Sequence, residues 1–464
     1  MSGTIRYQNS YCLRSLWRSI FSSRFHSLVF TLSLCIAIFF PCLPIPEAYG
    51  GSGDGIFSGV KMDWGGHVKA RGSVSWPDDE TLFGLVGTDP YYDGSVEGRL
   101  KSKLLLGECG YLETHYEMVF SGGDTRRKTK EIENLFPQFQ KGGFIARRPI
   151  NDERRFMDLT WTIDEQKGHI LYHRLDRLHL TLQPDWGTLA VGRQAVTWGN
   201  GLLFNPMDLF NPFSPSDIER DYKVGDDLVS VQVFAEKPGA FQFIYVPRRD
   251  PATDDVAWDQ SSVAGKLHMI RNTTEFDIMF AWHYDNPVIG LGSSGDLGAA
   301  AWRLDAVWSF TDDSERRDGY LTLVANMDYS WVWWDNNFYG FLEFYLNTLC
   351  DNDYEFELGE RDITERLGRG ELFTLGRTYV SGHIRWEAHP LLNIAMTVIN
   401  NVSDPSGMLQ PRAVWDVKQN VQVTVGGNIT YGSQETEFGG FNIPGTQFIQ
   451  KAPDSVFLWL TYFF

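Results

Sequence analysis

The sequence predicts an all-β chain that closes into an antiparallel transmembrane barrel of about 16 to 18 strands, with long outer loops and one inward-folded loop. Three observations predict this fold. Short runs of alternating apolar and polar residues recur from about residue 62 to the C-terminus. Many runs are ten to fifteen residues long, whereas globular strands are shorter and a tilted strand crosses lipid with about ten. The chain also ends on an uncharged, apolar stretch, Ser455 to Phe464.

Residues 1 to 50 have the composition of a secretory signal peptide. Four Arg and no acidic residue precede the apolar run from Leu28 to Phe40, and the small-residue stretch Ala48 to Gly50 follows it. The apolar run has 13 residues, fewer than the roughly 20 that a spanning helix needs. We therefore expect residues 1–50 to direct export and residues 51–464 to form one barrel domain.

The charge of the exported chain excludes one class of partner. The full sequence carries a net charge of −18, and removing the four Arg and one Glu of residues 1–50 makes it −21. Nucleic acid binding requires clusters of Lys and Arg on the protein surface, so we expect no nucleic acid partner. Two of the five Cys, Cys109 and Cys350, follow the signal segment, and their spacing leaves open whether they pair.

The stretch Thr274 to Asp285 illustrates the alternation. Its even-numbered positions from Phe276 to Tyr284 are all large and apolar, while most odd-numbered positions are polar. Successive strand side chains point to opposite faces, so one face is apolar and the other mostly polar. A soluble sandwich alternates too, with its apolar face turned inward. Long strands and aromatic residues near strand ends favour lipid, and lipid requires the sheet to close. The aromatic residues expected at the membrane interfaces are Trp302, Trp308, Trp331, Trp333, Tyr462 and Phe464.

The last strand carries a resemblance to a known class of protein. Leu458, Leu460, Tyr462 and Phe464 alternate on one face, and this strand resembles the closing strand of Gram-negative outer-membrane β-barrels. The resemblance implies that the chain lies in the bacterial outer membrane, in contact with lipid and lipopolysaccharide. It also implies that the barrel-insertion machinery reads the terminal aromatic residue. We expect this strand to pair with the first one, near Met62 to Arg71.

Loop lengths test the barrel prediction. Such barrels alternate short periplasmic turns with long outer loops. The turn Lys418 to Asn420 is short, while the connections Ser73 to Ser95 and Gly432 to Asp454 are long. The alternation fails around Leu175 to Gly187 and around Trp334 to Tyr339, where short turns follow one another. Either a strand is split or missed, or one outer loop is tight.

The segment Gly192 to Asp227 is the most distinctive loop. Two Asn-Pro steps and one Ser-Pro step interrupt regular structure, and apolar residues between them need a wall to pack on. We interpret residues 197–227 as a loop folded into the lumen; the alternative is an outer loop that covers its neighbours. The charged residues that it presents are Asp208, Asp217, Glu219, Arg220 and Asp221. Its "GRQ…WG…NP.D" pattern resembles poorly characterised porin-like families and, distantly, alginate-export-type barrels. The resemblance implies a lumen role for Arg193, Asn205 and Asp208.

A second candidate group is basic. His169, His173, Arg177 and His179 are separated by even numbers of residues and share one face of a regular strand. Positions four apart on a strand are about 13 Å apart, too far to bind one zinc ion together. We therefore expect His173, Arg177 and His179 to line the lumen, with Arg377, His383, Arg385 and Arg412 on later strands. Facing the acidic loop, they would set a transverse field across a water-filled pore.

The sequence contains no G-x-S-x-G, H-E-x-x-H or glycine-rich phosphate motif. We therefore expect no catalytic activity, cofactor or metal. The predicted function is a porin or solute-selective channel for small hydrophilic solutes. The alternative is an outer-membrane barrel without transport, which serves in adhesion or anchoring or, less in keeping with the sequence, as a barrel lipase. The sequence patterns do not select among solutes, among oligomeric states, or between an open and a plugged lumen.

Overall fold

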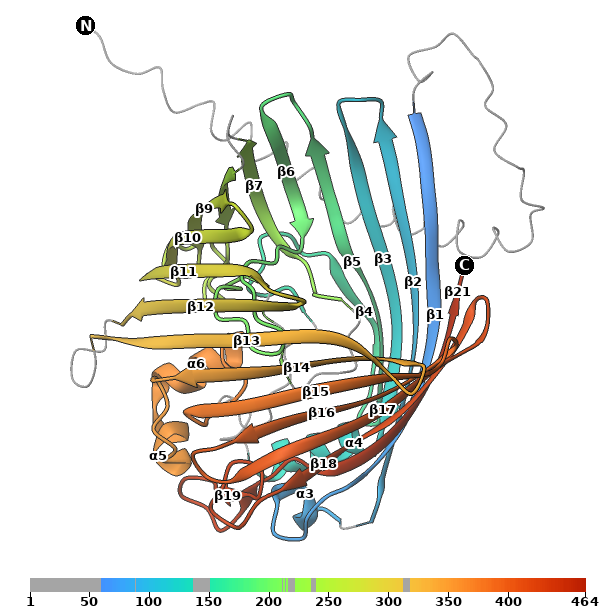
Figure 1. The fold of residues 1–464 in the computed structure, drawn as a ribbon. Coiled ribbons are helices and arrows are strands. Elements are labelled where there is room, and N and C mark those ends of the chain that lie inside the picture. The colour runs from blue at the N-terminus through green and yellow to red at the C-terminus, as the bar shows by residue number, and fades with distance from the viewer. Residues whose placement is uncertain are drawn as a thin grey trace, which may run out of the picture. The chain divides into compact units, whose positions relative to one another are not determined.

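The computed structural model describes residues 60–87, 89–136, 151–210, 212, 214–215, 222–234, 239–311 and 318–464. The predicted signal segment, residues 1–50, lies outside them. The described chain forms one antiparallel sheet that closes on itself, with eighteen strands in the ring (Figure 1). The predicted closed all-β barrel is thereby confirmed, at the higher of the two expected strand numbers.

The strands of the ring follow one another in sequence order, because each pairs with the next through a hairpin. A nineteenth strand, β4 (Thr160–Glu165), pairs with the first part of β5, and the short β6 pairs with the rest of the same edge. The first half of the ring is β1 (Val60–Trp76), β2 (Tyr91–Leu106), β3 (Gly110–Gly123), β5 (His169–Leu182), β6 (Gly187–Gln194), β7 (Asp226–Phe234), β8 (Gly239–Val246), β9 (Ser262–Arg271) and β10 (Thr274–His283). The second half is β11 (Asn286–Leu297), β12 (Ala300–Phe310), β13 (Gly319–Trp333), β14 (Asn336–Asn347), β15 (Thr378–His389), β16 (Leu392–Asn401), β17 (Ser406–Lys418), β18 (Val421–Tyr431) and β21 (Asp454–Phe463).

The closing pair joins β21 to β1. His67 lies opposite Phe463 and Trp76 opposite Asp454, so the C-terminal strand pairs with residues 67–76 of β1, a range that overlaps the expected Met62 to Arg71 and extends beyond it. Phe464 continues the pairing through backbone hydrogen bonds with Gly66 in both directions, at 2.9 and 3.1 Å. The predicted pairing of the last strand with the first is confirmed.

The outer face of the wall is apolar. On β21, Leu458, Leu460 and Tyr462 are 55, 50 and 49% exposed, whereas Phe457 and Trp459 on the inner face are 3 and 4% exposed. The same alternation holds on β10, where Phe276, Phe280 and Trp282 are exposed and Met279 is buried. A wall of exposed large apolar side chains around a closed sheet is the arrangement that lipid requires. The described helices include none that is long and apolar enough to span a membrane.

The two rims differ in loop length. One rim carries connections of two to four residues, such as Asn272–Thr273 between β9 and β10 and Trp334–Asp335 between β13 and β14. The other carries the long loops together with α3 (Leu82–Leu85), α4 (Asp124–Leu135), α5 (Tyr354–Gly359), α6 (Arg361–Arg369) and the small hairpin β19 (Phe441–Asn442) and β20 (Ile449–Gln450). Figure 1 shows these helices at one end of the barrel, with α5 and α6 at the lower left and α3 and α4 at the bottom.

The two places where loop alternation was expected to fail differ. Near Leu175 to Gly187, short turns follow one another because residues 166–168 join β4, a strand outside the ring, to β5. Near Trp334 to Tyr339 the alternation holds, since the turn Trp334–Asp335 lies between the longer connections 311–318 and 348–377. Tight turns on the long rim occur elsewhere, at Tyr284–Asp285 and at residues 402–405. Tyr284 and Asp285 both have left-handed backbones, with φ of 46° and 64°, as two-residue hairpins require. Neither tight turn lies where the sequence showed the alternation failing, so the tight outer loop does not explain those places; the extra strand β4 explains the first of them.

Candidate pore and lumen loop

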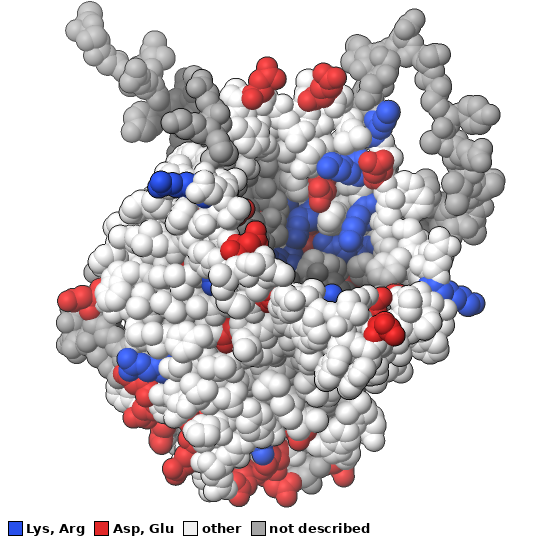
Figure 2. Space-filling model, in the orientation of Figure 1, with Lys and Arg blue, Asp and Glu red and all other residues white. Residues whose placement is uncertain are grey.

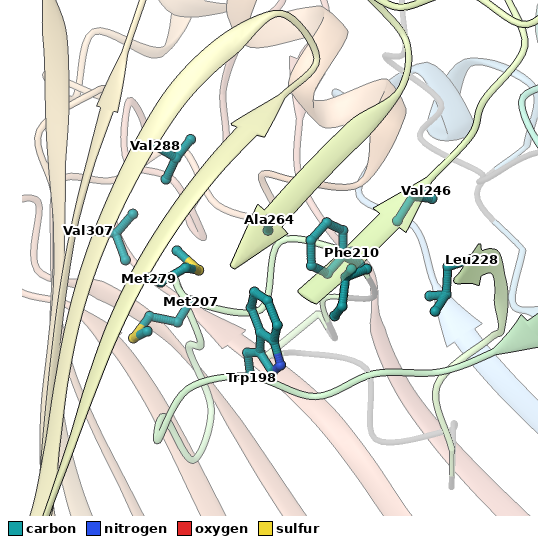
Figure 3. Close-up of a cluster of buried hydrophobic side chains, with 10 residues drawn as sticks. Trp198, Met207, Phe210, Leu228, Val246, Ala264, Met279, Val288 and Val307 are labelled. Atoms are coloured by element: carbon teal, nitrogen blue, oxygen red, sulfur yellow. The ribbon is translucent and has the colours of Figure 1, made fainter. Parts of the chain in front are cut away.

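The segment between β6 and β7, residues 195–225, is here named the lumen loop. Its first half crosses the interior of the barrel, because Trp198, Met207 and Phe210 pack against inner-face residues of β7 to β12 (Figure 3). The wall residues of this cluster are Leu228, Ile244, Val246, Ala264, Met279, Val288 and Val307. The inward-folded loop predicted from the sequence is confirmed in its described part. The apolar residues that seemed misplaced in a water-exposed loop form a core inside the barrel.

Two wall carboxylates hold the lumen loop on the far side. Glu343 on β14 accepts hydrogen bonds from three consecutive amides, those of Leu202, Leu203 and Phe204, at 2.7, 3.0 and 2.8 Å. Asp305 on β12 accepts from the backbone and side-chain amides of Asn200 at 2.6 and 2.7 Å. Both acids are buried, at 1 and 0% exposure. Hydrogen bonds to a charged acceptor each contribute about 1.5–3 kcal/mol, so the five together fix this part of the loop.

The position of Glu343 in the ring shows how far the lumen loop reaches across the barrel. β14 lies eight strands from β6 in a ring of eighteen, so the chain that leaves β6 reaches nearly the opposite wall. Phe204 completes the contact by stacking on Tyr345 of β14, with ring centroids 4.2 Å apart and planes 6° apart. The lumen loop therefore spans the cross-section rather than lying along one side of it.

Glycines make this crossing sterically feasible. Gly199 has φ of 87°, in the left-handed region, where it turns the chain so that Asn200 meets Asp305. On the wall, a Cβ at Gly292 would lie 2.7 Å from Asp305 Oδ1 and 3.2 Å from Met207 Sδ. A larger residue there would push the loop off the wall.

The return half of the lumen loop contacts the wall on the side of β2 and β5. Tyr222 donates a hydrogen bond to Glu97 of β2, and its ring lies 3.5 Å from the guanidinium carbon of Arg99. Lys223 forms an ion pair with Asp208 in the first half of the loop, and the Gly225 amide donates to Asp176 at 3.2 Å. Because Asp208 is only 3% exposed, it acts between the two halves of the loop rather than toward solvent.

Arg193, near the end of β6, is fully buried at the base of the loop. It donates to both oxygens of Asp227 at 2.8 and 3.0 Å, to Asp152 at 3.0 Å and to the Met157 carbonyl at 2.6 Å. The sequence placed Arg193 in the pore, and the structure corrects this, since an enclosed guanidinium meets no solute. Its partner Asp152 lies in the connection before β4, where the adjacent guanidinium groups hold the pKa of that carboxyl below its usual range against the opposing effect of burial.

The inner faces of β1 to β5 form a charged wall. Arg99 contacts both Glu117 and Asp176, and Arg174 donates to Glu117 at 2.5 Å. Arg71 and His67 flank Glu97 at 3.0 and 3.2 Å. Basic groups outnumber these acids along the wall, and Figure 2 shows a hollow in which several Lys and Arg side chains are visible. A polar, charged inner surface facing an apolar outer surface is typical of a water-filled lumen.

A β-bulge divides the basic residues of β5 between two faces. Asp176 is the extra residue, because His115 lies opposite Arg177 while the next residue, Tyr116, lies opposite Leu175. Arg177 and His179 therefore face the lumen, where Arg177 donates to Asp176 at 2.6 Å and His179 lies 4.0 Å from Glu113. His173 lies on the outer face, stacked on Trp161 of β4 with ring centroids 5.0 Å apart. The prediction that His173 shares a face with Arg177 and His179 is wrong, since regular alternation does not continue through a bulge.

The remaining predicted site residues are placed as follows. Asn205 is half-buried in the lumen loop, beside Gly199. Arg385 and Arg412 lie on the inner faces of β15 and β17, each opposite Ala395 of β16. Arg377 is exposed at the long rim, 3.2 Å from Asp351, away from the lumen loop. Asp217, Glu219, Arg220 and Asp221 lie outside the described residues. Strand register places the aromatic residues predicted for the membrane interfaces on the outer face, and Phe464 continues the outer face of β21. Their contact with lipid headgroups stays a prediction.

Sequence reasoning missed the residues that hold the loop, namely Asp305, Asn326, Glu343 and Tyr222. Acids in the polar half of an alternating strand look like ordinary lumen residues, so Asp305 and Glu343 gave no signal of their own. One signal was present on β11, where Gly290 and Gly292 occupy successive inward positions and leave room for Met207. Within the described residues no group of three or more His, Cys, Asp and Glu is placed to hold a metal ion. Cys109 and Cys350 are both free, which settles the pairing left open above.

No protein-family model and no curated protein sequence matches the chain. Among solved structures, it is similar to OccAB2 of Acinetobacter baumannii, at 9% identity and a TM-score of 0.49 over 87% of this chain and 98% of that one. It is also similar to Wzi of Escherichia coli, described as an outer-membrane protein of group 1 capsule assembly and a carbohydrate-binding β-barrel, at 11% identity and a TM-score of 0.49 over 86% of this chain and 84% of that one. OccK5 (OpdH) of Pseudomonas aeruginosa matches at 11% identity and a TM-score of 0.48, over 86 and 98% of the two chains. Similarities at this level do not identify the function or the solute of this chain.

Proposed function

We propose that the chain is an outer-membrane channel for small hydrophilic solutes, in which the lumen loop forms the constriction. The observation that carries the proposal is the attachment of residues 200–204 to Asp305 and Glu343 on the wall opposite β6. A loop held across a polar lumen leaves passage only between itself and the remaining wall. The rest of that wall, from β14 through β1 to β5, carries the charged and polar inner faces.

The outer membrane is the location that fits the two rims. Barrels in that membrane have short periplasmic turns and long outer loops. Here the short-turn rim also carries the C-terminus, and the long rim carries helices α3 to α6. The apolar outer face supplies the lipid-facing surface, and Phe464 lies at its short-rim edge beside Trp64, with ring centroids 6.1 Å apart.

The experiment that tests the proposal is conductance in planar lipid bilayers. Purified, refolded protein is expected to give stepwise current increases of uniform size, and small polar solutes are expected to enter liposomes that contain it. Absence of current over many insertions, with folding verified by heat-dependent gel mobility, would refute the channel.

The predicted charges of the lumen loop offer a second test. Replacing Asp217, Glu219 and Asp221 together by Asn, Gln and Asn is expected to shift the reversal potential toward anion selectivity, because it removes three negative charges from the proposed constriction. An unchanged reversal potential in a salt gradient would exclude these three residues from the conducting path.

One observation favours the alternative of a barrel without transport. The core formed by Trp198, Met207 and Phe210 with the inner wall fills the lumen along β7 to β12. A lumen partly filled in this way suits a surface anchor or adhesin. The bilayer measurement distinguishes the two functions, because an anchoring barrel gives folded, inserted protein without current.

A further inference from the structure

A strip of aromatic side chains lies on the inner face of the barrel, outside the apolar core that the lumen loop forms with β7 to β12. We name Tyr339 and Phe341 of β14 with His383 and Arg385 of β15 the lumen strip. Phe341 and His383 stack with ring centroids 5.3 Å apart and planes 14° apart, and Tyr339 lies 6.5 Å from Phe341. The Arg385 guanidinium lies 5.3 Å from the Tyr339 ring. None of the four is buried, and none belongs to a described apolar core.

Strand register establishes that the strip faces the lumen. Phe341 lies two residues before Glu343 on β14, so it shares the face on which Glu343 binds the lumen loop. Its neighbours on the outer face, Leu342 and Phe344, are 68 and 38% exposed to the lipid side. Apolar ring faces directed into an aqueous lumen are unfavourable unless a solute covers them.

The strip lies next to the proposed constriction, on the side of the short rim. From the loop anchor at Glu343, successive inward positions of β14 are Phe341, then Tyr339, toward the turn at Trp334–Asp335. A solute that passes the lumen loop therefore meets the strip next. The adjacent positions on β15 are His383, opposite Phe341, and Arg385, opposite Tyr339.

Polar groups surround the rings. Asp328 lies opposite Phe341 on β13 and accepts a hydrogen bond from Arg303 at 2.5 Å. His383 contacts Thr397 at 2.9 Å, and Arg385 and Arg412 both lie opposite the small Ala395, which leaves room between the two guanidinium groups. The ring faces can form apolar stacking contacts, and the guanidinium and carboxylate groups beside them can form hydrogen bonds.

These contacts match the chemistry of one class of solute. A pyranose ring has carbon-bound hydrogens on its faces, which pack against the electron-rich faces of aromatic rings, and hydroxyl groups on its edge, which bind charged planar side chains. A simple inorganic ion would gain little from contact with the rings, and an apolar solute would gain no hydrogen bond from the arginines. We propose that the lumen strip binds pyranose rings of short oligosaccharides on their way through the barrel; this inference rests on the proposed channel function.

The test uses maltohexaose and cellohexaose as probes of the full-length protein. Either sugar is expected to interrupt the open-channel current, more than polyethylene glycol of the same mass does. Phe341→Leu, which keeps apolar bulk and removes the ring, is expected to shorten the interruptions roughly fivefold to tenfold, and Phe341→Tyr to preserve them. Leu342→Ala, on the lipid side of the same strand, is the matched control and should behave as wild type.

Calorimetric titration of the same proteins in detergent micelles separates the two proposals. Sugar binding that is lost in Phe341→Leu and kept in Leu342→Ala supports the strip, even if bilayers show no current and the channel proposal fails. A conducting channel in which neither sugar binds, or in which Phe341→Leu binds as wild type, overturns the strip and leaves the channel intact.

Discussion

Glu343 is the residue on which the arrangement of the lumen loop most depends. Its two oxygens receive three backbone amides of the loop and the side-chain amide of Asn326 at 3.1 Å. Three adjacent amides directed at one buried carboxylate leave few alternative conformations for residues 202–204. The sequence could not predict this contact, because the partners are about 140 residues apart and the donors are backbone groups that any residue supplies.

Glu343→Gln is expected to weaken the attachment of the loop. The substitution replaces a charged acceptor by a neutral one and directs an NH₂ group toward backbone donors, a loss of about 1.5–3 kcal/mol. Single-channel recordings should show a larger or more variable conductance than wild type. Glu387→Gln removes the same charge from the inner face near the short rim, where Glu387 accepts a hydrogen bond from Asn337 at 2.8 Å, and serves as the matched control. Equal conductance changes in the two variants would contradict an anchoring role for Glu343.

Glu357 of α5 is expected to make the stability of the loop between β14 and β15 depend on pH. Burial raises the pKa of this carboxyl to about 7, while the amides of Asp351 and Asn352 donate to it. The folded loop binds this proton more tightly than the unfolded chain does. The protonated Glu357 therefore contributes its full stabilisation of the loop below about pH 4.5, and this contribution is lost as the pH rises toward 7.

Hydrogen exchange measured by mass spectrometry, corrected for intrinsic rates, should therefore show residues 348–377 more protected at pH 5 than at pH 8. Glu357→Gln, which keeps the acceptor and removes the charge, is expected to abolish the difference. Glu365→Gln, a more exposed acid of α6, serves as the control. Equal protection of the wild-type loop at both pH values would refute the effect.

At the scale of elements, the alternation of apolar and polar residues predicted where the strands lie, but it did not predict the bulge in β5 or the extra strand β4. Runs such as Thr274 to His283 are long, regular and flanked by turn residues, and they appear as strands with the predicted faces. The prediction for His173 failed because one residue, Asp176, is inserted into β5 as a bulge. The buried ion pairs of Asp176 with Arg99 and Arg177 favour this bulge, and the pair with Arg99 joins residues far apart in the sequence. Loop lengths were misleading near Leu175 to Gly187, where β4, a strand outside the ring, adds a short connection before β5.

Cys109 provides a direct test of which rim faces the periplasm. It is exposed in the short turn between β2 and β3, whereas Cys350 is buried in an outer loop. A membrane-impermeant maleimide is expected to label Cys109 only after the outer membrane is permeabilised, and Cys109→Ala should remove the signal. In that background, Ala252→Cys in the exposed β8–β9 loop should react on intact cells. Labelling of Cys109 on intact cells would reverse the proposed orientation.

At the scale of the whole molecule, composition and the C-terminal strand were sufficient to predict closure. An apolar outer face on every strand leaves no place for an open edge in lipid, and β21 pairs with β1 as this requires. What lies inside the barrel was predicted less well. The sequence indicated that residues 197–227 enter the lumen, but the apolar core with β7 to β12 and the anchors on β12 and β14 depend on which strands come to face each other. That arrangement follows from ring size, which alternation alone left between two values.

The single-channel conductance of a variant without the lumen loop tests the central claim most directly. Gln194 and Asp226 are opposite each other in the β6–β7 register, so a turn of about two to four residues can replace residues 195–225 while the barrel wall stays intact. The account predicts a conductance several times that of wild type, because the segment held across the cross-section is gone. A conductance equal to that of wild type, from protein that is folded and inserted, would show that this segment does not restrict the pore.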